Sequence, residues 1–376
     1  MAVKSWRRKP LGLFSKAVLW ANVCAVAALF VSYLAPVINP KTFWPIAFFG
    51  IAYLPLLVVN ILFIAYWAFR RGRFVLLSFT AILLGWGTLT KHVGFHTGGV
   101  DLSADSTGRD PNHVRLLTYN VHFFRTFHQD DTEPTIRNEA MQLMDSVSPD
   151  VICIQEYYTR QKGKFRMAKA FEREIGMRYH YFLPTAENEY EAYGMAIFSK
   201  YPIVGSGHVS GHEHGVNRVI YADIDKSGRI FRIYNVHLRS IGFQKEDYEF
   251  IKRPAKTLEK DAASTRRIGA RLKWAFSERS AQAEALRRHS QDCKTPYVIA
   301  GDFNDTPLSY AVNNVSSDLV NAFREKGRGW GVTYNGDFPN FQIDYILASK
   351  DFKVSRYQII KAKLSDHYPV WADLEL

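Results

Sequence analysis

The first 95 residues contain no aspartate or glutamate, although the chain of 376 residues has 36 acidic side chains. Three apolar stretches fill this region, at 13–38, 43–69 and 74–89. The first two exceed the roughly 20 residues that a helix needs to cross a bilayer, and the third approaches that length if it continues through Phe95. The pattern predicts a three-span membrane anchor over residues 1–95. A cleaved signal peptide is the rival, but its apolar core is usually only about 7 to 15 residues long.

Positive charge is concentrated in the same region. Ten of the 48 lysines and arginines lie in residues 1–95, which leaves the remainder with 38 basic and 36 acidic side chains, a net charge of +2. The pI of 9.4 is therefore poor support for nucleic-acid binding. Basic residues cluster before the first stretch and again at 70–73, between the second and third. The positive-inside rule then predicts that everything after residue 95 lies outside the cytoplasm, on the periplasmic side if the chain is bacterial.

A second, polar part of the chain follows. Residues 96–113 are rich in glycine, serine and aspartate and predict a linker. From 114 to 376, short β-rich runs alternate with helical patterns, such as the amphipathic period at 134–147. Polar residues stand at or just past the ends of many runs. This predicts an α/β domain with an active-site rim along one edge of packed sheets.

The stretch 243–275 interrupts that alternation. It is mostly helical in pattern, and its basic residues outnumber its acidic ones. Three interpretations stay open: a mobile flap, a membrane- or phosphate-facing surface, or a helical face that is simply solvated.

The polar residues after the predicted strands fit metal-assisted hydrolysis of a phosphodiester. Mg²⁺ prefers oxygen ligands, and Glu156 ends an apolar strand. Asp302 can orient and deprotonate a water, while Asn304, two residues later, can hold a phosphate oxygen. His367 stands beside a carboxylate and can act as a phosphate stabiliser or general acid, and His237 can serve likewise.

In their order along the chain, these pieces resemble the endonuclease/exonuclease/phosphatase superfamily, which has the DNase I-like fold. Two of the matching segments are Ala-Gly-Asp-Phe-Asn-Asp at 300–305 and Ser-Asp-His-Tyr-Pro-Val at 365–370. The others lie at 116–122, 154–156, 193–200, 234–238 and 343–347. The resemblance covers residues 114–376 and implies a four-layer α/β sandwich, with two packed sheets flanked by helices and the transmembrane helical anchor in front.

The resemblance also implies a role at each position. The metal ligand is Glu156, assisted by Asn120 and Asp366, and the ion is Mg²⁺, with Mn²⁺ as an alternative. The implied catalytic residues are His237, Asp302, Asn304, Asp344 and His367. Among these, Asp302 acts on the attacking water, Asn304 contacts the scissile phosphate, and Asp344 pairs with His367. Tyr193 and Arg218 are implied as additional phosphate contacts.

Two neighbouring positions are interpreted more simply. His122 is taken to follow the turn after Asn120. Gln342 stands two residues before Asp344, where many members of the superfamily have a basic residue, and is interpreted as a change at the rim of the site.

The expected function is a membrane-tethered, divalent-metal-dependent phosphodiesterase acting on lipid head groups, because the anchor holds the site near a bilayer. The alternative is an extracytoplasmic nuclease acting on DNA or RNA. A membrane scaffold that has lost turnover is a third class. The expected partners are the phosphodiester substrate and the lipid bilayer, and no obligate protein partner is evident.

Overall fold

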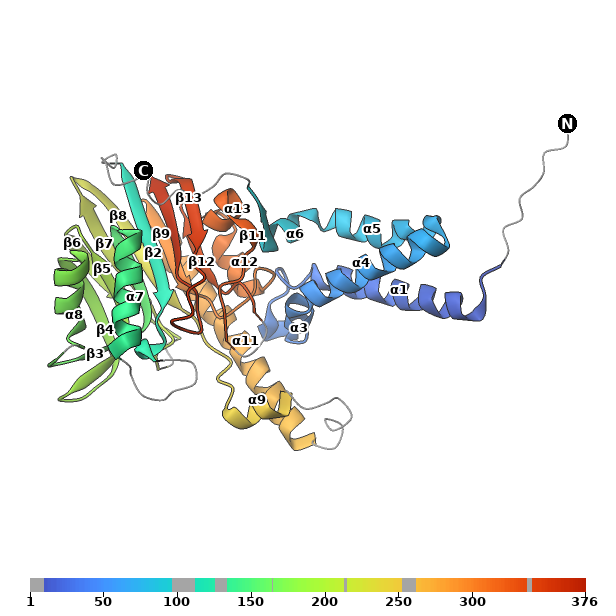
Figure 1. Cartoon of the computed structure of the whole chain (residues 1–376), viewed down its shortest axis with the longest axis horizontal. Coiled ribbons are helices and arrows are strands. Elements are labelled where there is room, and N and C mark those ends of the chain that lie inside the picture. The colour runs from blue at the N-terminus through green and yellow to red at the C-terminus, as the bar shows by residue number, and fades with distance from the viewer. Residues whose placement is uncertain are drawn as a thin grey trace.

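The computed structural model describes residues 10–96, 112–125, 134–163, 165–212, 215–251, 262–336 and 340–376. An elongated group of apolar helices projects from one side of a larger domain built on two sheets (Figure 1). The predicted linker at 96–113 lies almost wholly outside the described residues.

Two six-stranded sheets form the centre of the larger domain. The first has the order β10-β12-β9-β8-β7-β6 and comprises β6 (Ile203–His208), β7 (Val219–Lys226), β8 (Arg229–His237), β9 (Tyr297–Asp302), β10 (Val320–Asn321) and β12 (Asp344–Ala348). The second has the order β13-β14-β2-β3-β5-β4 and comprises β2 (His113–Asn120), β3 (Val151–Arg160), β4 (Tyr179–Glu187), β5 (Glu191–Ser199), β13 (Lys353–Ile359) and β14 (Val370–Glu375). Both sheets are mixed, since β8 runs parallel to β9 and β2 runs parallel to β3.

Helices cover the outer face of each sheet. α7 (Pro134–Val147) and α8 (Met167–Ala170) pack on the second sheet, and α11 (Ala262–Gln291) and α12 (Tyr310–Ser316) pack on the first. Apolar residues from both sheets form a shared core between them. The predicted four-layer sandwich and the helix at 134–147 are confirmed.

A buried ion pair and a buried amide pair hold this core together. Arg115 of β2 donates two hydrogen bonds, 2.6 and 2.7 Å long, to the carboxylate of Asp373 on β14. Between the sheets, the Gln155 amide donates to Asn235 over 2.6 Å, and Asn235 donates to two backbone carbonyls of the other sheet. Because each of these groups is buried, these bonds are needed to offset its desolvation.

The apolar region folds into six helices: α1 (Leu13–Ser32), α2 (Pro40–Phe43), α3 (Ile46–Ile51), α4 (Tyr53–Arg70), α5 (Val75–Leu84) and α6 (Trp86–His92). By length and composition, α1 and α4 qualify to cross a membrane, and α5 with α6 makes a third candidate if that bent pair is one span. We call α1, α4 and α5 the apolar bundle.

Two predicted spans are broken in the structure. The stretch 43–69 does not form one helix: a new helix begins at Tyr53, because Pro55 has no N–H and fits only in a first turn. The third stretch bends by 65° between Leu84 and Trp86.

The boundary of the predicted anchor also needs correction. Residues Val93–Phe95 do not extend the third helix. They form β1, which pairs antiparallel with β11 (Arg328–Trp330) of the larger domain. The chain therefore leaves the bundle as a strand that is hydrogen-bonded to the larger domain. Pairing with β1 satisfies backbone N–H and C=O groups of β11.

Candidate active site

The last residues of β2, β8 and β9 lie beside an irregular point within β3, at one edge of the sandwich. Asn120 and Glu156 come from the parallel pair β2 and β3, and His237 and Asp302 come from the parallel pair β8 and β9. Parallel neighbours present the same end at the same edge, so each pair brings its two polar side chains together. The two sheets then bring the two pairs face to face.

Asp302 lies at the centre of the group. Its Oδ2 is 3.5 Å from His237 Nε2 and 3.7 Å from His367 Nε2. The same oxygen accepts a hydrogen bond from the amide of Asn120 at 3.3 Å and from that of Asn304 at 3.0 Å. The structure therefore gathers four of the predicted residues around one buried carboxylate.

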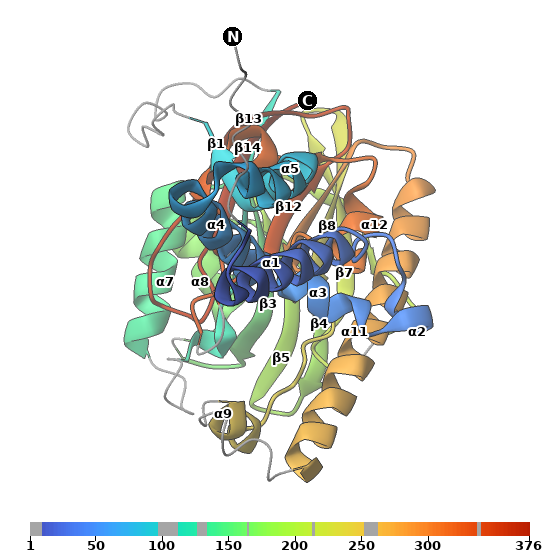
Figure 2. The ribbon, with the colours of Figure 1, turned by 90° about the vertical axis from the view of Figure 1, so that its right-hand side faces the viewer.

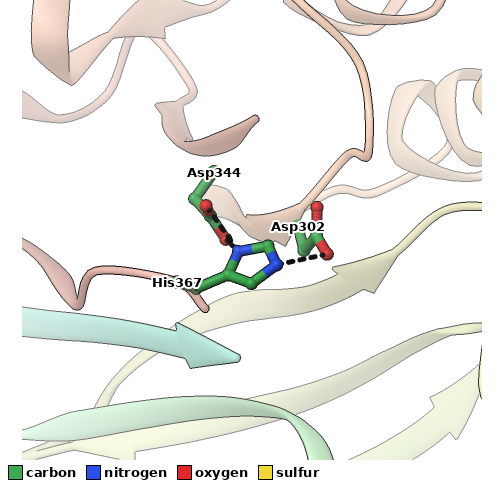
Figure 3. Close-up of side chains that lie close together, drawn as sticks. All are labelled: Asp302, Asp344 and His367. Atoms are coloured by element: carbon green, nitrogen blue, oxygen red, sulfur yellow. Dashed lines mark hydrogen bonds and ion pairs between the residues drawn. The ribbon is translucent and has the colours of Figure 1, made fainter. Parts of the chain in front are cut away.

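His367 and Asp344 form a close pair beside Asp302 (Figure 3). His367 Nδ1 is 2.9 Å from one carboxylate oxygen of Asp344 and 3.2 Å from the other. Burial by itself lowers the pKa of His367, but the charges of Asp344 and Asp302 outweigh it and raise that pKa well above its usual value. The imidazole is thus held as a cation, with Nε2 directed at Asp302.

The pKa of the Asp302 carboxyl is raised, whereas the pKa of a carboxyl beside a cation is usually lowered. Burial raises its pKa to about 6, and the carboxylate of Asp344 adds to the rise, whereas His367 and His237 oppose it. A carboxylate with a pKa close to neutrality is suited to accept a proton, since general bases work best near the operating pH.

The backbone around Asp302 is tightly constrained. Gly301 has φ 141°, and a Cβ there would lie 2.1 Å from the carbonyl oxygen of Val236. Asn304 also has positive φ, 52°, and its backbone N–H donates to Asp302 Oδ1 at 2.7 Å. Both amide hydrogens of Asn304 are donated within the protein, to Asp302 and to the carbonyl of Leu238. To donate a hydrogen bond to a phosphate, the Asn304 amide has to give up one of these two hydrogen bonds.

Glu156 is placed by an irregularity in its strand. The pairing of β3 with β5 shifts register between Ile154 and Tyr157, and Glu156 has φ 50°, a conformation that non-glycine residues seldom adopt. Bulges of this kind redirect a side chain, and strained backbone is concentrated at functional sites. The strained residue is the one that the sequence predicts as the main metal ligand.

The carboxylates of Glu156 and Asp366 face the same imidazole. His122 Nδ1 is 3.4 Å from Glu156 Oε2 and 3.7 Å from Asp366 Oδ1. Burial lowers the pKa of His122, but the hydrogen bond to Glu156 and the charge of Asp366 raise it overall. The sequence assigned His122 only to a turn, and its position beside two acids was not visible in the spacing.

The chemistry of this donor set fits a hard divalent cation. Glu156 and Asp366 keep 18% and 14% of their side chains exposed, whereas Asp302 and Asp344 are almost fully buried. The amide nitrogen of Asn120 is 3.4 Å from Glu156 Oε1, and its amide oxygen accepts a hydrogen bond from the backbone N–H of His122. Carboxylate and amide oxygens with room for water are the surroundings that Mg²⁺ prefers.

A second group of possible ligands is Asp302, Asp344 and His367, whose donor atoms lie within 4.8 Å of one another. We interpret this group as acid–base machinery instead. His367 Nδ1 already contacts Asp344. The nitrogen and the carboxylate oxygen are 2.9 Å apart, a distance at which a proton between them forms a hydrogen bond.

Tyr193 and Arg218, the two predicted phosphate contacts, have other partners. The Tyr193 hydroxyl donates to Glu191 at 2.9 Å, and its ring packs against Phe123. Arg218 Nε donates to the carbonyl of Gly215. Within the described part of the chain, neither side chain contacts the group around Asp302.

Gln342, interpreted from the sequence as a change at the rim of the site, is a buried side chain. It is 5% exposed, because the close approach of Gly331 and the surrounding loop covers it. Two nearby residues were missed altogether. The hydroxyl of Thr333 accepts hydrogen bonds from the backbone of Ile343 and Asp344, and the ring of Tyr334 packs edge-on against His367 at 5.3 Å. Neither carries a recognisable signal in the sequence.

Comparison with known proteins agrees with this geometry. The family model described as "Endonuclease/Exonuclease/phosphatase family" matches residues 117–367, and a model described as a domain of unknown function matches residues 15–92. None of the curated proteins compared with the chain matches it.

Two solved structures share the fold. One, an endonuclease/exonuclease/phosphatase from Beutenbergia cavernae, is 19% identical, with 70% of this chain and 72% of that chain covered and a TM-score of 0.51. The other, from Bacteroides vulgatus, is 18% identical, with 70% and 99% covered and a TM-score of 0.51. These likenesses establish the fold alone, whereas the family model spans most of the chain and every predicted catalytic position. The chain therefore belongs to the endonuclease/exonuclease/phosphatase family, whose members are hydrolases that generally use divalent metals.

Proposed function

We propose that the protein is a membrane-anchored, Mg²⁺-dependent phosphodiesterase whose substrates are lipid phosphodiesters. The observation that carries the hydrolytic part is the group of side chains around Asp302, which combines a base of raised pKa with a cationic imidazole. Mn²⁺ is the alternative ion, because it shares the preference of Mg²⁺ for oxygen ligands.

In the proposed mechanism, each side chain of this site has a separate role. Asp302 accepts a proton from the attacking water, and Asn304 holds Asp302 in place and contacts the phosphate after releasing Leu238. His367, kept protonated by Asp344, donates a hydrogen bond from Nε2 to the phosphate, and His237 supports the opposite side of Asp302. Glu156, Asn120 and Asp366 would hold the metal, which supplies positive charge to the non-bridging oxygens.

The anchoring part is supported by the construction of the apolar bundle, which buries polar groups and exposes apolar ones. Asn22 of α1 donates to Ser78 of α5 over 2.7 Å, and Ser78 donates to Asn60 of α4 over 2.8 Å. All three residues are buried. Its large exposed side chains include Leu13, Phe14, Trp20, Leu62, Phe69, Leu76 and Leu84. Bundles in lipid are expected to pack in this way, since lipid tails solvate apolar side chains and polar groups bond between helices.

The orientation also has support. The basic segment at 70–73 joins α4 and α5 at the end of the bundle remote from the catalytic domain (Figure 1). With positive charge inside, the catalytic domain would lie on the extracytoplasmic side, the periplasmic side in a bacterium. We accordingly propose residues 1–92 as the anchor and 114–376 as the catalytic domain.

A lipid substrate is favoured over nucleic acid for two reasons. The anchor keeps the site beside a bilayer, and the net charge of +2 after residue 95 argues against a long basic footprint for a duplex.

The test is a substrate panel on the full-length chain in detergent and in liposomes with Mg²⁺. The panel comprises bis-p-nitrophenyl phosphate, sphingomyelin-type and phosphoinositide-type vesicles, and DNA. We expect turnover of the small diester and of at least one lipid, with about 10²- to 10⁴-fold losses in Asp302→Asn and His367→Ala. Asp145→Asn and His96→Ala, at exposed positions, are the matched controls.

The substrate panel tests the catalytic chemistry and the substrate class separately. Full activity in Asp302→Asn would refute the assigned chemistry. Turnover of DNA but of no lipid would replace the lipid enzyme with the nuclease. Metal binding without any turnover would indicate a scaffold.

A further inference from the structure

We propose that the catalytic domain rests directly on the bilayer through a second, peripheral contact, an anionic-lipid-binding face on the N-terminal half of α11. This inference rests on the proposed membrane anchoring. It adds a surface of the catalytic domain that contacts lipid head groups beside the membrane spans. The same element also adjoins the active site.

The surface belongs to a projecting element that we call the arm, comprising residues 243–251, which include α9 (Lys245–Ile251), and residues 262–275 of α11. A buried carboxylate joins its two parts. Asp247 of α9 is 2.9 Å from Arg267 Nε and 3.3 Å from Arg271 Nε, and Arg271 also donates to the carbonyl of Gly242. The arm is therefore a single unit, and Asp247 offsets one of the two positive charges of these arginines.

The outer face of α11 keeps uncompensated charge. Residues 262–275 contain no acidic side chain, and Arg266, Lys273 and Trp274 are exposed. The guanidinium of Arg239 stacks on the ring of Trp274 at 3.9 Å, so the indole is flanked by positive charge. Cations beside an exposed indole are the composition expected at a membrane interface.

The exposed tryptophans of the catalytic domain lie near the bundle. Trp274 is 42% exposed and Trp330 is 56% exposed, whereas Trp371 is buried. Trp330 lies on β11, which pairs with β1 at the point where the chain leaves the bundle. On β1, Phe95 stacks with Trp86 of α6 at 5.6 Å. Trp86, Phe95 and Trp330 thus form an aromatic patch where the chain leaves the bundle, and Trp274 lies two residues before Phe276, which packs against α3.

Beyond the arm, α11 contacts the short apolar helices α2 and α3 and the residue before α2. Phe276, directly after the arm, packs edge-on against Phe48 of α3 at 5.6 Å. Farther along α11, Glu284 accepts hydrogen bonds from Asn39 at 2.7 Å and from Lys41 at 2.9 Å. The N-terminal end of α11 projects on the same side of the domain as the bundle, and Figure 2 shows it below the bundle from that side. If the bundle is in the membrane, this geometry brings α11 to the lipid surface.

The inner side of the arm contacts the active site. The hydroxyl of Tyr248 on α9 is hydrogen-bonded to Tyr334. The ring of Tyr334 packs against the catalytic imidazole of His367. Through these two tyrosines, α9 of the arm is connected to the proposed catalytic imidazole.

The partner to which we commit is a bilayer surface rich in anionic phospholipid. The exposed acids of the arm, Glu246 and Glu249, belong to α9 and not to the basic face of α11. Each basic residue near an anionic membrane strengthens binding by about 5-fold, from roughly 1 kcal/mol per charge.

Hydrogen exchange of the full-length chain in nanodiscs tests the contact. Discs of phosphatidylcholine are compared with discs containing phosphatidylserine. We expect slower exchange of residues 262–275 in the anionic discs, and loss of that protection in Arg266→Glu/Lys273→Glu and in Trp274→Ala. The charge-matched control is Lys169→Glu/Arg178→Glu, at exposed positions on α8 and just before β4, in the helix–sheet pair farther from the bundle (Figure 1).

Turnover gives a second readout. The ratio of lipid to bis-p-nitrophenyl phosphate hydrolysis should fall about 5-fold or more in Arg266→Glu/Lys273→Glu, but not in the control pair. Equal exchange in both kinds of disc would overturn the inference. Release of the protein from membranes by alkaline carbonate would instead show that the anchoring itself is wrong, so the two failures are distinguishable.

Discussion

At the scale of single residues, the site depends on charges that perturb one another in a buried space. Asp302 and Asp344 are both nearly inaccessible to solvent, and His367 lies between them. Two buried carboxylates would repel each other strongly without a cation, and the imidazolium supplies one. The same arrangement recurs at the mouth of the site, where His122 lies between Glu156 and Asp366.

The first prediction concerns pH. In the proposed mechanism, activity requires Asp302 deprotonated and His367 protonated, so the rate should fall as pH drops through about 6 and again as pH rises through the raised pKa of His367. Asp344→Asn removes the largest influence that raises the pKa of His367. The alkaline limb of kcat/KM should therefore move to lower pH, and the acidic limb should move in the same direction, because the Asp344 carboxylate also raises the pKa of Asp302. An alkaline limb that stays in place in this variant would contradict the assigned pair.

The second prediction concerns the metal. Glu156→Gln keeps the size of the side chain but removes its negative charge from the proposed metal site. The Mg²⁺ concentration that gives half-maximal activity should rise about 10- to 100-fold, as measured by titration after chelation. Glu139→Gln, an exposed position on α7, is the control. An unchanged Mg²⁺ requirement in Glu156→Gln would mean that the ion is held elsewhere.

At the scale of elements, the sheets are connected by buried polar bonds in addition to their ladders. The carboxyl-terminal strand β14 is fixed beside β2 by Arg115 and Asp373, and the Arg115 guanidinium also lies over the ring of Trp371 at 4.5 Å. The same strand follows directly after the segment that carries Asp366 and His367. Loosening β14 would therefore displace the catalytic imidazole as well as the core.

The third prediction follows from that pair. Asp373→Asn leaves the buried Arg115 charge uncompensated, which should cost about 3–5 kcal/mol of stability and lower the melting temperature of the full-length chain in detergent. Burial raises the pKa of Asp373, but the hydrogen bonds from Arg115 outweigh it and lower that pKa overall. The stabilisation is thus complete above the unfolded pKa near 3.9 and is lost as pH falls through the lower folded value.

The matched control for this variant is Asp351→Asn, which replaces a carboxylate in the turn before β13. If Asp373→Asn melts with the wild-type protein at pH 7 and shows the same acid sensitivity, the pair does not contribute as described.

At the scale of the whole molecule, the bundle and the catalytic domain are joined by direct packing as well as by the chain between them. Leu308, six residues after Asp302, packs among bundle residues that include Leu29 and Leu57. The side chain of Asn313 on α12 donates to the carbonyl of Pro36 and accepts from Lys91. The orientation of the site relative to the bundle is therefore fixed by contacts on both sides of the interface.

The fourth prediction tests this docking. A Cβ on Gly50 of α3 would lie 2.9 Å from the carbonyl oxygen of Leu308, so Gly50→Val should force the bundle away from the loop after Asp302. Overpacking of this kind costs about 1–3 kcal/mol. We expect faster hydrogen exchange at residues 306–313 and a lower ratio of lipid to soluble turnover. Gly87→Val is the control, because no atom lies within 4 Å of a Cβ there, and equal exchange in the two variants would argue against docking.

The sequence determined the fold class and the ingredients of the site. Continuous apolar runs predicted β2, β3 and β9, and the polar residue that ends each run was identified correctly as part of one group. Strand ends can be recognised in this way because a buried strand cannot tolerate polar side chains unless they are functional or paired. Strands with mixed composition, such as β4, β6 and β13, gave no such signal and were not predicted.

Only the tertiary structure decided which neighbours those residues have. His122, Thr333 and Tyr334 enter the site because left-handed turns and sheet-to-sheet packing bring them there, and these depend on contacts between distant parts of the chain. The apolar composition of the first 92 residues likewise predicted helices long enough for a membrane. Their breaks, their buried polar bonds and their docking beside α11 are properties of packing, which local sequence patterns do not encode.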